Sequence, residues 1–170
     1  MKIERFWSMP NPDTFSITPI KKYLEDIFSN GVYGVDPFVR NSPFKNNCLS
    51  NDLDETINAD EHKDAVVFLK GLISASYDLV LFDPPYSPRQ LAECYKKMKL
   101  AVNMETTQSS FWSNCKKEIS RIIKKGGRVI SFGWNSGGIG KKYGFEIEYI
   151  MLIAHGGQHN DTIMVVERRV

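Results

Sequence analysis

The sequence has few of the residues that usually build metal or disulfide sites. Its cysteines, Cys48, Cys94 and Cys115, have no CxxC spacing, and its 3 histidines show no ligand spacing either. We therefore expect reduced cysteines that serve packing, as in a cytosolic protein, and no metal site.

Long apolar runs and strong charge are also missing. The longest apolar run, Tyr149 to Ala154, is far too short to span a membrane, and there is no signal peptide, repeat or low-complexity segment. A net charge of +2 does not by itself indicate a nucleic-acid-binding protein. With 42% hydrophobic and 25% charged residues in 170, the sequence predicts one soluble, intracellular (cytoplasmic) domain, residues 1–170.

The most informative stretch is a short apolar segment that ends at two prolines. Leu79 to Phe82 has the pattern of a strand buried on both faces, as in the middle of a parallel sheet. Pro84 and Pro85 cannot donate ladder hydrogen bonds, so the strand must end at Asp83. The carboxyl edge of an open α/β sheet is where ligands bind, which makes this turn a candidate site.

The residues of this turn suit a planar base that carries an amino group. Asp83 and the carbonyl oxygen of Pro84 are two acceptors that could hold one NH2 group. Tyr86 offers a flat face on which a base can stack, with Pro85 lining the pocket. An exocyclic amine on a base taken out of its stack would fit this set. The alternative is a strand followed by a proline turn in which Tyr86 only packs.

Acidic residues also follow the earlier predicted strands. Val32 to Asp36 predicts a strand that ends in an acid, which is typical of the first βα corner of a nucleotide-binding sheet. Asp52 follows Asp36 by sixteen residues, near the position where such folds hold a ribose diol, and Asn51 is its neighbour. Asp64 precedes a helical pattern and is a candidate N-terminal cap.

Strands and helices alternate along the chain, which predicts the α/β class. Residues 1–18 are expected to be irregular, and further short strands are expected at 47–53 and 57–62. Helices are expected from Thr18-Pro19, with Thr18 as the N-terminal cap, to Asn30-Gly31, from Asp64, from Ser87-Pro88, and from Ser110 to the Gly126-Gly127 stop. A polar loop is expected at 103–110, and 145–154 with 162–166 predicts an antiparallel hairpin.

Asp83-Pro84-Pro85-Tyr86 resembles the catalytic motif of S-adenosylmethionine-dependent amino-methyltransferases, above all the adenine-N6 DNA methyltransferases, and the compact size resembles small phage-type members. The resemblance implies a class I (Rossmann-like) methyltransferase fold, with a mostly parallel sheet and a C-terminal antiparallel hairpin. It implies S-adenosylmethionine as the cofactor, bound by Asp36, Pro37, Phe38, Asn51 and Asp52, with Asp64 on its adenine amino group.

The resemblance extends to Asp13–Ile17, whose counterpart in the family touches the methionine end of the cofactor, which adds Thr14, Phe15 and Ile17 to the expected cofactor site. It fails at one place: Arg40-Asn41-Ser42 stands where the family has glycines, which let the backbone approach the ligand. Side chains there would crowd the cofactor unless the loop takes a different path.

The sequence thus predicts methyl transfer to an exocyclic base amine, adenine N6 in DNA first of all. An RNA base-amine methyltransferase of the same fold, a catalytically inactive methyltransferase-like subunit, and an unrelated nucleotide-binding domain stay open. With no separate target-recognition domain in 170 residues, DNA specificity would come from short loops, a homodimer partner or a separate subunit.

Overall fold

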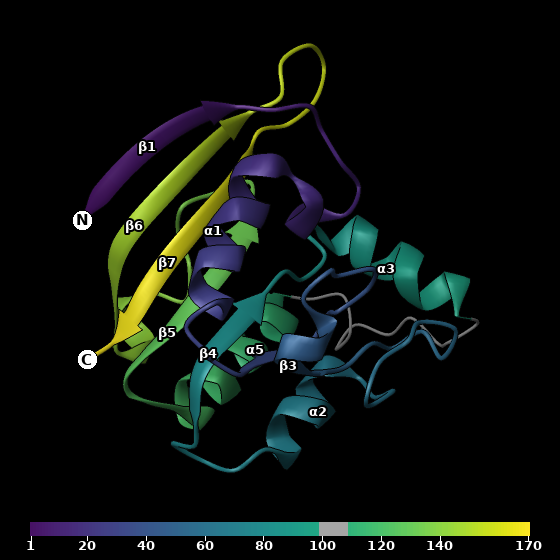
Figure 1. Ribbon diagram of the computed structural model, residues 1–170. Coiled ribbons are helices and arrows are strands. Elements are labelled where there is room, and N and C mark those ends of the chain that lie inside the picture. Colours follow the sequence, from purple (N-terminus) through teal and green to yellow (C-terminus); the bar gives the residue numbers. More distant parts are fainter. Residues whose placement is uncertain (99–108) are drawn as a thin grey trace.

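The computed structural model describes residues 1–98 and 109–170. Within them the strands form a seven-stranded sheet in the order β1-β6-β7-β5-β4-β2-β3 (Figure 1). Strand β7 runs antiparallel to both its neighbours, β5 and β6, and the remaining pairs are parallel. The predicted fold class, a mostly parallel α/β sheet with a C-terminal antiparallel hairpin, is confirmed.

The strands are β1 (Lys2–Trp7), β2 (Gly34–Asp36), β3 (Cys48–Ser50), β4 (Tyr77–Phe82), β5 (Ile123–Gly133), β6 (Phe145–Ala154) and β7 (Thr162–Arg169). The helices are α1 (Thr18–Phe28), α2 (Ala65–Gly71), α3 (Pro88–Lys97) and α5 (Ser109–Ile122), with short 3-10 turns at Thr14–Ser16, Lys45–Asn47 and Lys141–Tyr143. None of the helices in the described ranges is long and apolar enough to cross a membrane.

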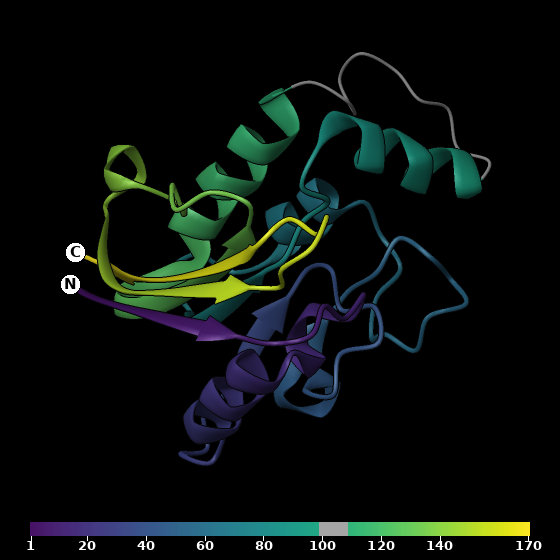
Figure 2. The same cartoon turned by 90° about the horizontal axis from the view of Figure 1, so that it is seen from above.

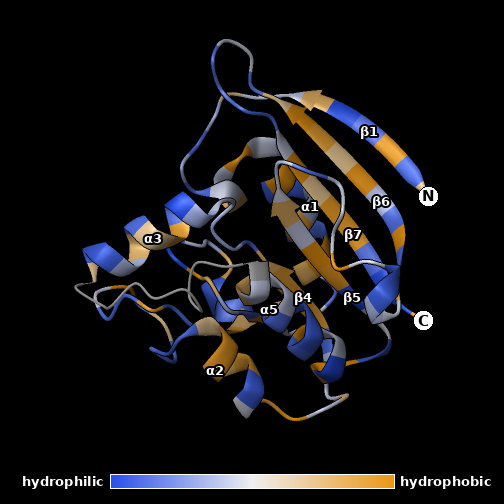
Figure 3. Cartoon of the chain, turned by 180° about the vertical axis from the view of Figure 1, so that it is seen from behind, coloured by the Kyte–Doolittle hydropathy of each residue, from blue (hydrophilic) through white to orange (hydrophobic). Residues whose placement is uncertain are grey.

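The central strand β4 joins two hydrophobic cores. Leu79 and Leu81 pack into the core beneath α1, whereas Val80 and Phe82 face the core shared by α2 and α5. Successive side chains of a strand point to opposite faces, so a strand with helices on both sides is apolar throughout. Figure 2 shows α1 and α5 on opposite sides of the sheet, and Figure 3 shows α2 and α5 over the second face.

Local signals placed the starts of two helices correctly. The Ser87 hydroxyl accepts from the Gln90 amide at the start of α3, and the Asp64 carboxylate caps α2. For α1, the predicted range is confirmed, but Thr18 is already inside the helix, so its predicted role as the cap is wrong: Ile17 occupies the cap position without a side-chain hydrogen bond.

The prediction of irregular backbone over residues 1–18 is wrong for its first part. Lys2–Trp7 forms the edge strand β1, parallel to β6, in a register that pairs Lys2 with Tyr149 and Trp7 with Ala154. Most of its side chains are exposed, so the segment buries too little to show an apolar pattern. Its structure comes from pairing with a strand distant in sequence, which local propensity does not report.

The end of α5 also differs from prediction. The helix stops at Ile122, and Lys124 and Lys125 belong to β5 rather than to the last helical turn. Strand β5 shifts register against β4 at this point, and Gly126 has a φ of +82°, which glycine adopts without strain. The glycine pair therefore permits an irregularity in the strand instead of ending the helix.

Two further expectations concern connections. The strand predicted at 57–62 is reduced to an isolated bridge between Asn51 and Glu61. Of the polar loop predicted at 103–110, residues 103–108 lie outside the described ranges, and Ser109 and Ser110 belong to α5.

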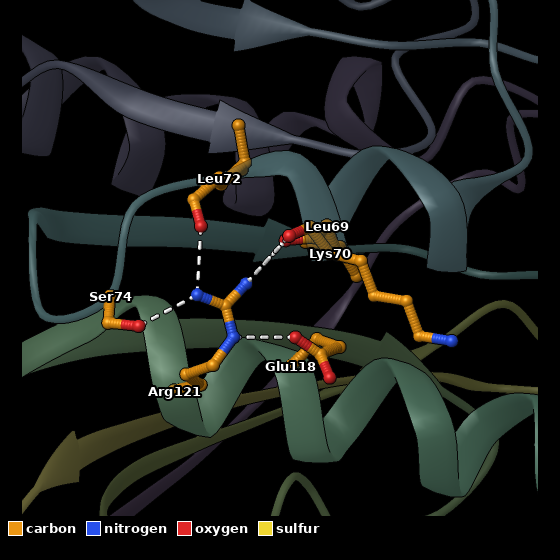
Figure 4. Close-up of polar contacts among 6 residues, drawn as sticks. All are labelled: Leu69, Lys70, Leu72, Ser74, Glu118 and Arg121. Carbon is orange, nitrogen blue, oxygen red and sulfur yellow. Dashed lines mark hydrogen bonds and ion pairs between the residues drawn. The ribbon is translucent and has the colours of Figure 1, made fainter.

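The guanidinium of Arg121, on α5, closes the carboxyl end of α2 (Figure 4). It donates to the Leu69 carbonyl at 2.9 Å, the Leu72 carbonyl at 2.8 Å and the Ser74 hydroxyl at 2.8 Å, and pairs with Glu118 at 2.7 Å. The last carbonyls of a helix have no partner within the helix, so this fork satisfies groups that would otherwise need water.

We expect Arg121→Ala to lower the free energy of unfolding by about 2 kcal/mol, because it removes several charge-assisted hydrogen bonds at once. Arg121→Lys should recover only part of the loss, since an ammonium group cannot reproduce the planar fork. Urea denaturation measures both. The exposed Lys117 on the same helix provides the control: if Lys117→Ala is as destabilising as Arg121→Ala, the role assigned to Arg121 is wrong.

Candidate active site

The carboxyl ends of β2 and β4 lie side by side at the centre of the sheet. These strands are neighbours, with Val35 paired to Val80, although β3 lies between them in the chain. The strand order therefore reverses here, and ligands of open α/β sheets bind at such a point. Asp36 ends β2, and Asp83 follows β4, so the topology brings together two acids far apart in sequence.

A cavity of about 680 Å³ opens at this edge, a volume typical of small-molecule and cofactor sites. Its wall includes nine of the residues predicted from sequence: Thr14, Pro37, Phe38, Asn51, Asp52, Asp83, Pro84, Pro85 and Tyr86. Four other predicted residues, Phe15, Ile17, Asp36 and Asp64, do not line it. The described residues contain no group of three or more His, Cys, Asp or Glu side chains placed to hold a metal ion.

Hydrogen bonds fix the turn after β4 from several sides. The Tyr86 hydroxyl lies 2.6 Å from Oδ1 of Asp83, to which it donates, and 3.3 Å from the Thr14 hydroxyl. The Tyr86 amide donates to the Gln90 side chain at 2.7 Å, and the Trp112 indole donates to the Pro85 carbonyl at 3.1 Å. The hydrogen bond from Trp112 could not be predicted from the sequence, because Trp112 lies on a helix 27 positions after Pro85.

The Asp83 carboxyl is buried, with 8% of the residue exposed, yet it lines the cavity. Burial raises its pKa, while the hydroxyls of Tyr86 and Thr14 and the charge of Arg40 oppose this rise. Burial and the neighbouring Asp83 also raise the pKa of Tyr86, so this phenol stays protonated and can keep donating. The turn therefore presents a shielded acid whose proton affinity depends on its neighbours.

Trp134 forms an aromatic corner with Tyr86. The two ring centroids are 5.5 Å apart and the planes are inclined by 70°, with Trp134 still 43% exposed at the cavity wall. Glu167, buried on β7, accepts from the amides of Ile139 and Gly140 and so fixes the far end of the loop that carries Trp134. No role for Trp134 was expected from the sequence.

Asp36 is the most deeply buried acid of the site. Its Oδ1 accepts from the Phe38 amide at 3.1 Å, while Oδ2 has no hydrogen-bond partner among the described residues. Burial, reinforced by the charges of Asp83 and Asp52, raises the pKa of Asp36 to about 8. Asp36 immediately precedes Pro37 and Phe38 in the sequence, and these two residues line the cavity whereas Asp36 does not.

The loop that follows this corner takes a glycine-like path at an arginine. Arg40 has a φ of +45°, in the left-handed region that the glycine of the family pattern would adopt freely. Its amide donates to Oδ2 of Asp52 at 3.0 Å, and the preceding Val39 amide donates to the Asn51 carbonyl at 3.0 Å. The loop thus keeps the backbone form expected for glycine while it carries a large cation.

Asn51 and Asp52 brace the loops around the cavity. The Asn51 side-chain amide donates to the carbonyls of Pro37 and Lys63, and its oxygen accepts from the Lys63 amide. Asp52 accepts from the amides of Arg40 and Asp54, one on each oxygen. Both residues line the cavity, so the contacts predicted with a cofactor remain a prediction alongside this structural role.

Asp64 has both of its oxygens occupied. Oδ1 caps α2 through the amides of Val66 and Val67, and Oδ2 accepts a 2.5 Å hydrogen bond from the hydroxyl of Tyr95 on α3. The predicted helix cap is confirmed. The predicted contact with a cofactor amino group stays a prediction, and it would require Tyr95 to give up its bond.

Comparisons with known proteins identify the fold. No family model matches the sequence, and no curated protein matches it. TrmN from Thermus thermophilus superposes with a TM-score of 0.60 and 13% identity over 91% of this chain and 49% of TrmN. An rRNA methylase from Streptococcus thermophilus superposes with a TM-score of 0.55 and 11% identity, over 96% of this chain and 99% of that protein. SMU.1697c of Streptococcus mutans, a candidate methyltransferase in complex with SAH, superposes with a TM-score of 0.54 and 13% identity. The match covers 88% of this chain and 97% of SMU.1697c.

These likenesses, with the strand order, show that the chain has the class I methyltransferase fold. The fold carries this conclusion alone, because the sequence identities are low. The chain spans about half the length of TrmN.

The pKa of Asp36 predicts a pH-dependent stability. The ordinary pKa of an aspartic acid side chain is 3.8, and that of folded Asp36 is about 8, so between these pH values the folded state holds a proton that the unfolded chain has lost. Stability should therefore fall as the pH rises through this window. Asp36→Asn cannot ionise, so its free energy of unfolding relative to wild type should increase from about pH 5 to about pH 9.

Thermal or urea unfolding of both proteins at the two pH values measures this change. Asp26→Asn, at an exposed position on α1, is the control and should show the same difference from wild type at both. An equal difference for Asp36→Asn would show that this group does not titrate in the predicted window.

Proposed function

We propose that this protein transfers a methyl group from S-adenosylmethionine to an exocyclic base amine, adenine N6 in DNA first of all. The observation that carries the proposal is Asp83-Pro84-Pro85-Tyr86 at the carboxyl end of β4, facing a cavity of about 680 Å³ at the switch point of a class I methyltransferase fold.

The residues around the cavity fit S-adenosylmethionine. The volume lies in the range of cofactor sites, and Asp83 brings a carboxyl group to the cavity wall. A carboxyl in this position suits a cationic group, since a positive charge nearby would favour its ionised form. SMU.1697c, which shares the fold, is in complex with SAH. When bound, S-adenosylmethionine supplies an electrophilic methyl group on a sulfonium.

In this proposal the tetrad holds the amine. Asp83 and the Pro84 carbonyl accept from the two N–H bonds, so the nitrogen lone pair points away from both acceptors. No donor within residues 1–98 and 109–170 reaches the Pro84 carbonyl, whereas the Pro85 carbonyl is taken by Trp112. The acceptors also stabilise the positive charge that develops on nitrogen, and the raised pKa of Asp83 makes it a better proton acceptor.

The aromatic corner supports the choice of a planar base. Tyr86 and Trp134 offer two ring faces at the wall, and stacking on one aromatic ring is worth about 1–3 kcal/mol per base. Pro85 would line the same pocket. Holding the base in one orientation next to the cofactor supplies much of the acceleration of a two-substrate displacement.

A second candidate is methylation of a base amine in RNA. An rRNA methylase shares this fold over nearly the whole of both chains, and the tetrad chemistry suits either nucleic acid. A homodimer or a separate specificity subunit belongs to the proposal for both substrates.

The proposal predicts that Asp83→Asn, which keeps the shape of the side chain, lowers methyl transfer by about a hundredfold or more while S-adenosylmethionine still binds. Tritiated methyl transfer to unmethylated DNA and to RNA, together with calorimetry of cofactor binding, measures both effects. Asp78→Asn, at the exposed start of the same strand, is the control and should retain activity. Full activity in Asp83→Asn would remove Asp83 as the amine acceptor, and absence of cofactor binding to the wild-type chain would overturn the enzyme proposal.

Tyr86→Phe tests the link between the hydroxyl and Asp83. The hydroxyl lowers the pKa of Asp83, so its removal should raise that pKa. A higher pH is then needed to ionise Asp83, and the acidic limb of the pH–rate profile should move to higher pH. A profile with an unchanged acidic limb would show that ionisation of Asp83 does not control the rate.

A further inference from the structure

Arg40 occupies a backbone conformation that disfavours it. Its φ of +45° lies in the left-handed region, where a bulky side chain costs of order 1 kcal/mol or more and glycine costs nothing. The hydrogen bond from its amide to Asp52 depends on the backbone alone, so glycine or asparagine could make it equally well. The loop needs this conformation, but it does not need an arginine to reach it.

The Arg40 side chain adds a cation to the cavity. The residue is exposed, follows the β2 corner and lines the same cavity as the tetrad. Asp83, Tyr86 and Cys94 line the same cavity, and the positive charge of Arg40 lowers the pKa of all three. Among the ion pairs formed by the described residues, none involves Arg40.

A guanidinium group has five N–H donors and no acceptor, so it selects carboxylates and phosphates. The cofactor proposed above carries one anionic group, the α-carboxylate of its methionine part, next to an α-ammonium group. The exposed guanidinium of Arg40 at the β2 corner is a cation of the cavity wall and matches this carboxylate.

We propose that Arg40 binds the α-carboxylate of S-adenosylmethionine, so that a charged side chain replaces the close backbone approach that glycines would allow. This inference rests on the proposed function and adds to it a residue that determines cofactor specificity. It also gives a reason for an arginine at a position whose backbone conformation favours glycine.

The test compares S-adenosylmethionine with its decarboxylated analogue, which lacks only the carboxylate. Calorimetry of both compounds is carried out with wild type, Arg40→Asn and Arg40→Lys. Asparagine tolerates the left-handed conformation and removes the charge, whereas lysine keeps the charge without the fork. Lys97→Gln, which removes another exposed cation of the cavity wall, is the matched control.

We expect wild type to bind S-adenosylmethionine about tenfold to a hundredfold more tightly than the analogue, because charge-assisted hydrogen bonds to the carboxylate are lost. Arg40→Asn should lose this preference through weaker binding of S-adenosylmethionine and unchanged binding of the analogue. Arg40→Lys should keep part of the preference and Lys97→Gln all of it. Thermal unfolding of each variant confirms that it is folded.

Two outcomes overturn the inference in different ways. If wild type binds neither compound, the proposed function fails for this chain and the role of Arg40 fails with it. If wild type binds S-adenosylmethionine but Arg40→Asn keeps the full preference for the carboxylate, only the role of Arg40 fails. Weaker binding of an oligonucleotide to Arg40→Asn in that case would assign the guanidinium to a nucleic-acid phosphate.

Discussion

Two carboxyl groups are buried side by side at the centre of this sheet, and the architecture of the site depends on them. Asp36 ends β2 and Asp83 follows β4, the strand beside it, and the charge of Asp83 raises the cost of ionising Asp36 beyond the effect of burial. Isolated buried carboxylates are unfavourable, so such a pair needs hydrogen-bond donors, protons or cations. The protein supplies Tyr86 for Asp83 and the Phe38 amide for Asp36, and it leaves one oxygen of Asp36 without a partner among the described residues. Of the two, Asp83 lies at the cavity wall, where a carboxyl group favours a ligand that carries positive charge.

The position of these acids follows from elementary features of the chain. Pro84 and Pro85 end the central strand at a fixed residue, and the reversal of strand order places that end beside the β2 corner. Asp83 lines the cavity, whereas Asp36 is fully buried and does not line it. The tetrad and the β2 corner are therefore adjacent for topological reasons.

Much of this arrangement was predictable, because the relevant signals are local. A few consecutive residues are enough to predict the buried strand β4 and the prolines that end it. The same is true of the helix caps Ser87 and Asp64. The parts that failed depend on tertiary structure: β1 exists through its pairing with β6, and the glycines after α5 permit an irregular strand rather than a helix stop. Trp112 and Trp134 reach the site from elements far along the chain, so only the packed structure brings them to the tetrad.

Arg40 shows most clearly why residue identity alone is ambiguous. In the sequence, an arginine in place of glycine predicts crowding of the cofactor unless the loop takes a different path. In the structure the same residue has the left-handed backbone that the loop requires, held by Asp52, so the change alters the chemistry of the wall and not its course. Losing the close approach of the backbone to a cofactor and gaining a positive charge in the same cavity as Asp83 have different consequences for the site. The second is compatible with a working site, since a zwitterionic ligand needs both signs of charge.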